Sequence, residues 1–161
     1  MNKLFFFLGV MFFSQSVLSI ELKCDFEEVY KNGEINQGKI MIRSDLFRYQ
    51  YKKNNLYTLI LNKKGLFLKD NFGDRPAQRI NQNSEIIKNV IDAAYNYPNI
   101  EKEYIRDNLH ISIEDGFEKK FIKRLAIRSD KVNMALYFNN CDYLKINSLY
   151  FDHENFIRFN D

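Results

Sequence analysis

The chain has 161 residues and a formal net charge of +3, with 24 Lys and Arg residues against 21 Asp and Glu residues. This length allows one domain with one hydrophobic core. Residues of opposite charge are interspersed along the chain, which argues against a basic nucleic-acid-binding arm and against a polybasic membrane patch.

The first nineteen residues are predicted to be a secretory signal that is cleaved after Ser19. Lys3 supplies the positive start of such a signal, and the apolar run Leu4–Phe13 has the length of its hydrophobic part. This run is shorter than the roughly 20 residues that a membrane-spanning helix needs. An uncleaved membrane anchor is the alternative. The predicted mature domain covers residues 20–161 and is exported.

The two cysteines, Cys24 and Cys141, are predicted to form a structural disulfide. Both lie in the exported part of the chain, where the environment is oxidising. The alternative, a reactive or metal-binding pair, would favour a CxxC spacing or a nearby histidine, and the sequence has neither. The bond would close a loop of more than a hundred residues and stabilise the fold by about 4–5 kcal/mol.

Alternation of apolar and polar residues with a period of two predicts a mainly β fold, an antiparallel sheet with one buried face. Asn32-Gly33 and the turn Asn62–Gly65 predict two tight hairpins. The predicted strands cover residues 25–30, 38–43, 47–51, 57–61, 66–69, 109–113, 121–128, 134–138 and the alternating tail 143–159.

One segment of helical periodicity interrupts the strands, so helices are predicted over about residues 84–106. Apolar residues at 86, 87, 90, 91, 94 and 95 form a stripe, with Ser84 as the N-cap and Pro98 after the end. Asn99 is predicted to cap a second short helix that continues through Ile105. These helices would either plug the core of a curled sheet or form a lid over an apolar cavity.

No catalytic or metal-binding set is predicted. His110 and His153 lie far apart, and the sequence lacks the GxSxG, HExxH and glycine-rich phosphate-loop motifs. We therefore expect no enzyme activity, no cofactor and no metal ion.

Five segments of the chain carry strand, turn and aromatic patterns that follow one another in a defined order. Gly38–Arg43 is a strand that ends in a basic residue, Asp45–Tyr49 holds a Leu-Phe pair and an aromatic residue, and Leu59–Phe67 is a hairpin with a polar, glycine-containing turn. With the later hairpin Leu125–Phe138 and the spaced aromatic residues of Asn147–Phe159, they resemble the periplasmic outer-membrane lipoprotein carrier (LolA-type) family.

The chain departs from that family at three places. Family members usually have an amphipathic helix before the first strand, whereas Cys24 follows the predicted cleavage site closely. The family commonly has proline at the position of Ser44. The extra C-terminal segment of some members is missing.

The resemblance implies an incomplete antiparallel β-barrel whose apolar concave face is covered by helices. Such a carrier takes a triacylated lipoprotein from an inner-membrane ABC-type release complex to an outer-membrane acceptor. The chain would then be a periplasmic monomer that shields an acylated lipoprotein or a related lipid, because exposed acyl chains cost about 0.8 kcal/mol per CH₂ group.

The resemblance also assigns roles to residues. Arg43 matches a basic residue that holds the lid by bonding to its backbone; the alternative is a surface cation at a strand end. Phe47 matches an apolar residue of the concave side. The predicted hydrophobic cargo-binding residues are Phe47, Tyr49, Tyr51, Leu59, Leu61, Ile87 and Ile91.

Two other classes of function remain open. A small outer-membrane β-barrel is disfavoured by the short strands, the inserted helix and charges such as Arg48, Lys123 and Arg128 among the apolar positions. A structural periplasmic interaction module would have a barrel filled by its own side chains. The carrier and the module differ in whether aromatic residues such as Tyr49 and Tyr51 line a cavity or fill it.

Overall fold

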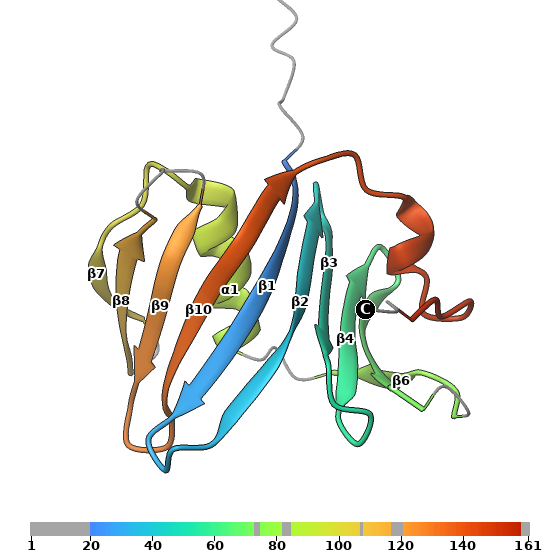
Figure 1. Cartoon of the computed structure of the whole chain (residues 1–161), viewed down its shortest axis with the longest axis horizontal. Coiled ribbons are helices and arrows are strands. Elements are labelled where there is room, and N and C mark those ends of the chain that lie inside the picture. Colours follow the sequence, from blue (N-terminus) through green and yellow to red (C-terminus); the bar gives the residue numbers. More distant parts are fainter. Residues whose placement is uncertain (1–19, 73–74, 82–84, 107, 117–120, 159–161) are drawn as a thin grey trace, which may run out of the picture.

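A computed structural model describes residues 20–72, 75–81, 85–106, 108–116 and 121–158. The predicted signal, its cleavage site and the predicted N-cap Ser84 lie outside these residues. In the described part, ten strands form one antiparallel sheet that does not close (Figure 1). The elements are β1 (Glu21–Tyr30), β2 (Ile35–Arg43), β3 (Leu46–Tyr51), β4 (Tyr57–Asn62), β5 (Gly65–Asp70), β6 (Gln78–Ile80), α1 (Glu85–Asn96), β7 (Glu103–Arg106), β8 (Leu109–Asp115), β9 (Ile122–Arg128), β10 (Asn133–Tyr143) and the 3-10 helix η1 (Ser148–Phe151).

The sheet consists of two meanders that meet at its centre. From the central strand β1, strands β2 to β6 follow in order to one edge of the sheet. The chain then passes through α1 to the opposite edge strand, β7, and returns through β8 and β9 to β10, which pairs with β1. Helix α1 therefore connects the two edges and lies across one face of the sheet (Figure 1). This arrangement confirms the predicted incomplete barrel with an inserted helix.

The apolar core lies between α1 and the concave face of the sheet. Alternate residues of β1 are buried at Leu22, Cys24 and Phe26, as the period of two predicts. The helix contributes Val90, Ala93 and Ala94, of which the two alanines are small enough for its backbone to approach the strands closely. The described members of the predicted stripe, at 87, 90, 91, 94 and 95, therefore lie on the packed face of α1. Within the described residues, no helix is long and apolar enough to cross a membrane.

The C-terminal segment (residues 144–158) covers part of the convex face, so the prediction that the tail continues the strand pattern is wrong. Its Ile146 and Phe151 pack with Met41 and Ile60 of the sheet. The fully buried Arg48 fixes it, since its Nη1 donates to the Tyr150 carbonyl at 2.6 Å and its Nη2 donates to the Ile157 carbonyl at 2.5 Å. Burial lowers the pKa of Arg48 to about 10, so it remains a cation at neutral pH.

The prediction of a second short helix through Ile105 is also wrong. Residues Glu103–Arg106 form the edge strand β7, in which Tyr104 pairs with Ile111 and Arg106 pairs with Leu109 of β8. The backbone N–H and C=O groups on the outer side of β8 need hydrogen-bond partners, and β7 supplies them. Strand β6, at the other edge, was likewise not predicted.

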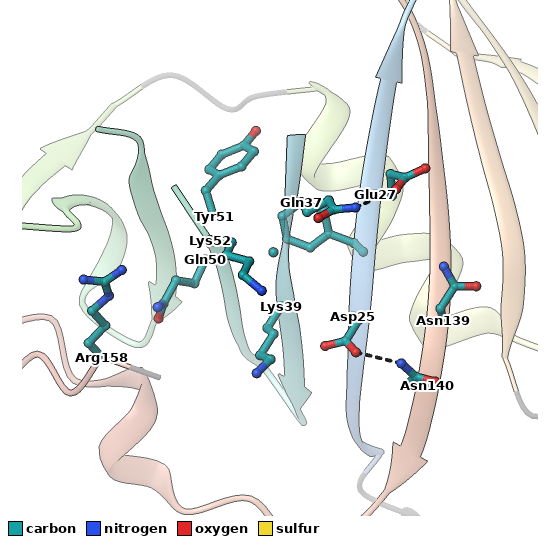
Figure 2. Close-up of a pocket in the computed structure, with 12 residues that line it drawn as sticks. Asp25, Glu27, Gln37, Lys39, Gln50, Tyr51, Lys52, Asn139, Asn140 and Arg158 are labelled. Atoms are coloured by element: carbon teal, nitrogen blue, oxygen red, sulfur yellow. Dashed lines mark hydrogen bonds between the residues drawn. The ribbon is translucent and has the colours of Figure 1, made fainter. Parts of the chain in front are cut away.

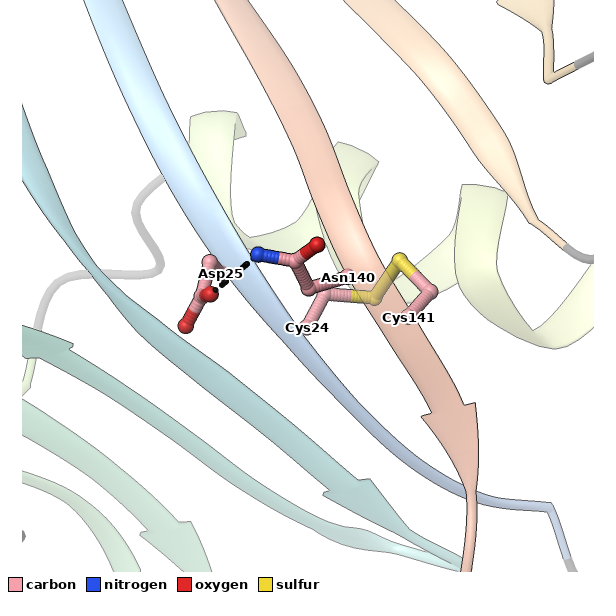
Figure 3. Close-up of a disulfide and its surroundings, with 4 residues drawn as sticks. All are labelled: Cys24, Asp25, Asn140 and Cys141. Atoms are coloured by element: carbon pink, nitrogen blue, oxygen red, sulfur yellow. Dashed lines mark hydrogen bonds between the residues drawn. A yellow bond between two sulfur atoms is a disulfide. The ribbon is translucent and has the colours of Figure 1, made fainter.

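The predicted disulfide between Cys24 and Cys141 is present, with an S–S distance of 2.08 Å and a Cα–Cα distance of 4.1 Å (Figure 3). The bond crosses from β1 to β10 at a β-bulge, which is seen as a change of register between Lys23 and Asp25. The extra residue, Asn140, has a φ of 50° and donates a hydrogen bond to Asp25 Oδ2 at 2.9 Å. The bond therefore joins the two meanders where they meet, and it fits an oxidising compartment.

Candidate ligand-binding site

A cavity of about 180 Å³ lies between α1 and the concave face of the sheet. Its walls come from β1, β3, β4, β10 and the helix, and they include five of the seven predicted cargo-binding residues: Phe47, Tyr49, Tyr51, Leu59 and Ile87. The other two, Leu61 and Ile91, are partly buried against the same core. The fold therefore brings together the residues that the sequence pattern selected, and their cargo-binding role stays a prediction.

Aromatic rings form much of the cavity wall. The ring of Tyr49 stacks on Phe26 with a centroid distance of 3.9 Å, and Tyr51 meets Tyr49 edge to face at 5.4 Å. Tyr57 continues this series at 5.5 Å from Tyr51. Tyr49 and Tyr51 are buried, whereas Tyr57 is 41% exposed and stands at the rim of the cavity. The aromatic residues therefore line a small space and also fill much of the core around it.

A buried carboxylate, Glu28, lies in this aromatic wall. It is 4% exposed, and its oxygens accept hydrogen bonds from the hydroxyls of Tyr49 at 2.6 Å, Tyr51 at 2.9 Å and Tyr30 at 2.9 Å. Burial, and then the charge of Glu28, raises the pKa of all three tyrosines, so these hydroxyls keep their protons and act as donors. Among the described residues, Glu28 forms no ion pair, and these three hydroxyls are its side-chain hydrogen-bond donors.

Sequence reasoning missed Glu28, although a signal was available. Glu28 follows Leu22, Cys24 and Phe26 at the same spacing of two residues, which places its side chain on the concave face. A carboxylate at a core position of a strand needs hydrogen-bond donors nearby. The tyrosines of β3 provide them.

One arginine of an edge strand holds α1 in place. The Nη1 atom of Arg106 in β7 donates to Asp92 Oδ2 and lies 3.5 Å from Asn89 Oδ1, both on the helix. The side chains of Arg106 and Asp92 are 39% and 37% exposed. This contact joins an edge strand to side chains of α1, whereas the bond predicted for Arg43 was to the backbone of the lid.

Arg43 itself lies on the convex face, away from α1. It is opposite Glu21 in the β1–β2 register, and its Nε is 3.2 Å from Glu21 Oε1. The other oxygen of Glu21 accepts a hydrogen bond at 2.6 Å from the backbone of Ile146, so Arg43 belongs with the C-terminal segment. The lid-latch role stays a prediction that this position does not support. Ser44 has a φ of 49°, which the ring of the family's proline could not adopt.

A second, polar pocket of about 290 Å³ lies on the convex face (Figure 2). It is lined in part by Gly38, where an added Cβ would lie 2.1 Å from the Gln50 carbonyl oxygen. Asp25 is opposite the cation Lys39 in the β1–β2 register, and Glu27 accepts a hydrogen bond from Gln37 Nε2 at 2.8 Å (Figure 2). Charges of both signs are typical of a solvated surface, so this pocket indicates no particular ligand.

The described residues contain no group of three or more His, Cys, Asp or Glu side chains that could hold a metal ion. No protein-family model matches the chain. No curated protein matches it either. The resemblance to the LolA-type carriers therefore stays a prediction based on the residues quoted above.

Proposed function

We propose that the protein is a periplasmic carrier that shields the acyl chains of an outer-membrane lipoprotein, or of a related lipid, on the concave face of its sheet. The observation that carries this proposal is the position of the seven predicted cargo-binding residues, which all line or adjoin one apolar core under α1. By resemblance, an inner-membrane ABC-type release complex would supply the cargo and an outer-membrane acceptor would receive it.

Binding of an acyl chain requires α1 to move. A cavity of about 180 Å³ is similar in size to an engineered cavity of about 150 Å³ that holds one benzene molecule. An acyl chain is much larger, so it would have to replace part of the helix on the sheet. Each CH₂ group removed from water contributes about 0.8 kcal/mol, and a chain of about a dozen such groups would therefore contribute roughly 10 kcal/mol.

The contacts of α1 support such an exchange. Among its described side chains, the buried apolar ones are Val90, Ala93 and Ala94, which bury less apolar area than leucine or phenylalanine would. Ile87, Ile91 and Tyr95 are only partly buried against the same core. The helix is also tied to the sheet by a partly exposed ion pair, Arg106–Asp92. An acyl chain could therefore replace the helix without a large net loss of apolar burial.

The disulfide agrees with the first step of the proposal, which is export to an oxidising compartment. The periplasm as the particular compartment, and the two membrane complexes as partners, rest on the resemblance.

A structural interaction module is the competing function. The observation that favours it is the near-complete filling of the concave core, in which Leu22, Ile40 and Ile111 are fully buried beneath α1 or beside it. In this case the helix would be a permanent plug, and the molecule would bind partners through its outer surface.

Lipid analysis and probe binding separate the two functions. Mass spectrometry of protein isolated from the periplasm should find a lipid or an acylated peptide, and the purified protein should bind a fluorescent acyl probe. Replacing the half-buried cavity residue Ile87 with Gln should weaken probe binding several-fold. The matched control Lys88→Gln changes the exposed neighbour on the same helix and should leave binding unchanged. Absence of both co-purified lipid and probe binding would favour the module.

A further inference from the structure

We propose that Glu28 makes the cavity selective for an apolar ligand whose head group is a primary ammonium. The inference rests on the proposed function, since it names the class of ligand for the same concave face. It starts from a carboxylate that is 4% exposed and that, among the described residues, has neutral hydroxyls as its hydrogen-bond partners.

The balance of charge favours a cation at this position. Removing an ionised carboxylate from water is unfavourable unless hydrogen bonds and an opposite charge compensate for it. Tyr30, Tyr49 and Tyr51 supply hydrogen bonds to Glu28 but no charge. An ammonium group in the adjoining cavity would supply the charge and would donate further hydrogen bonds.

The surrounding rings favour the same kind of head group. The faces of tyrosine rings attract cations within about 6 Å of their centres. Tyr49, Tyr51 and Tyr57 line the cavity next to Glu28, with successive centroids 5.4 and 5.5 Å apart. A carboxylate or phosphate head group would instead be repelled by Glu28 and by the electron-rich ring faces.

The cavity also offers a route for the rest of the ligand. Tyr57, which is 41% exposed, stands at the rim, and Ile87 and Val90 of α1 form the opposite wall. An ammonium group and its first carbon atoms fit into about 180 Å³ while α1 is in place. The remaining alkyl chain would extend between the helix and the sheet as α1 moves outward.

Three ligands with ten carbon atoms each test the inference on the full mature protein. Isothermal titration calorimetry should show that decylammonium binds at least ten times more tightly than decanoate, with decanol between them. Glu28→Gln keeps the shape but removes the charge, and it should abolish this preference while leaving decanol affinity within a factor of about two. The matched control Glu27→Gln changes the neighbouring carboxylate on the opposite face of β1 and should keep the preference.

The outcomes separate the inference from the proposed function. Equal binding of the three ligands by the unmodified protein, or an unchanged preference in Glu28→Gln, would overturn the ammonium inference and leave an unselective carrier. No binding of any ligand would overturn the proposed function as well. If Glu28→Gln does not fold, Tyr57→Leu removes a rim ring while leaving Glu28 in place. It should weaken decylammonium binding more than decanol binding, and equal weakening would count against the inference.

Discussion

Replacing Arg106 with Gln should make α1 leave the sheet more often. The ion pair between Arg106 and Asp92 is more than one third exposed on both sides, so solvent screens it. Exposed ion pairs contribute about 0.2–1 kcal/mol, whereas hydrogen bonds to charged groups contribute about 1.5–3 kcal/mol. We expect a value between these ranges, about 1 kcal/mol, which corresponds to a roughly five-fold increase in the opening equilibrium.

Hydrogen exchange followed by mass spectrometry measures this equilibrium. Amides of α1 (Glu85–Asn96) should exchange about five times faster in the variant, because exchange from a locally opened helix follows its opening equilibrium. The exchange rates of amides in β1 and β10 near the disulfide should be unchanged, since these amides report on the central strands and not on α1.

Arg43→Gln is the matched control. Its ion pair with Glu21 is also partly exposed, at 29% and 21%, but it lies on the convex face. This variant should leave exchange in α1 unchanged. The reasoning would be refuted if Arg106→Gln had no effect on α1, or if Arg43→Gln accelerated exchange there equally. The latter result would restore the lid-latch role predicted for Arg43.

Three further predictions concern the stability of the fold. Arg48→Met removes the donors to the carbonyls of the C-terminal segment, so that segment should become sensitive to limited proteolysis, with a loss of about 2–3 kcal/mol in its docking; an uncleaved segment would contradict this. Unfolded tyrosines lose their protons from about pH 10, whereas the raised pKa of Tyr49 keeps its proton in the folded state, so the free energy of unfolding should fall as pH rises above about 10. Urea titrations should show a smaller fall in Tyr49→Phe, and an equal fall would exclude Tyr49 as a source. Reduction of the Cys24–Cys141 bond, which closes a separation of 117 residues, should destabilise the protein by about 4–5 kcal/mol; two free thiols found by alkylation of the native protein would remove its basis.

Strand periodicity predicted the concave face well because burial alternates along strands such as β1 and β8. Phe47, Tyr49 and Tyr51 alternate with polar residues, and all three enter the core under α1. The hairpin turns could also be predicted, because each depends on a glycine within the turn itself. Gly33 and Gly65 both have a positive φ. The packed stripe of α1 follows from its own spacing in the same way.

The errors arose where contacts between distant residues decide the structure. Phe151 and Phe156 lie in the tail that was predicted to continue the strand pattern, but they pack on the convex face around Arg48, about a hundred positions earlier in the chain. The residue that holds α1 could not be chosen from the sequence either. The choice between Arg43 and Arg106 depends on which strand lies beside Asp92, and the β7 pairing that settles it was itself missed.

The disulfide turns most of the domain into a covalent ring that runs from Cys24 to Cys141 and includes α1 and both edge strands. If α1 leaves the concave face as proposed, it remains attached to an edge strand at each end, and the bonded centre of the sheet keeps the two halves together. Return of the helix is therefore an intramolecular reaction with a high effective concentration. In the proposed carrier, the rate at which the helix displaces a bound ligand should then be independent of protein concentration, so each molecule would load and unload by itself.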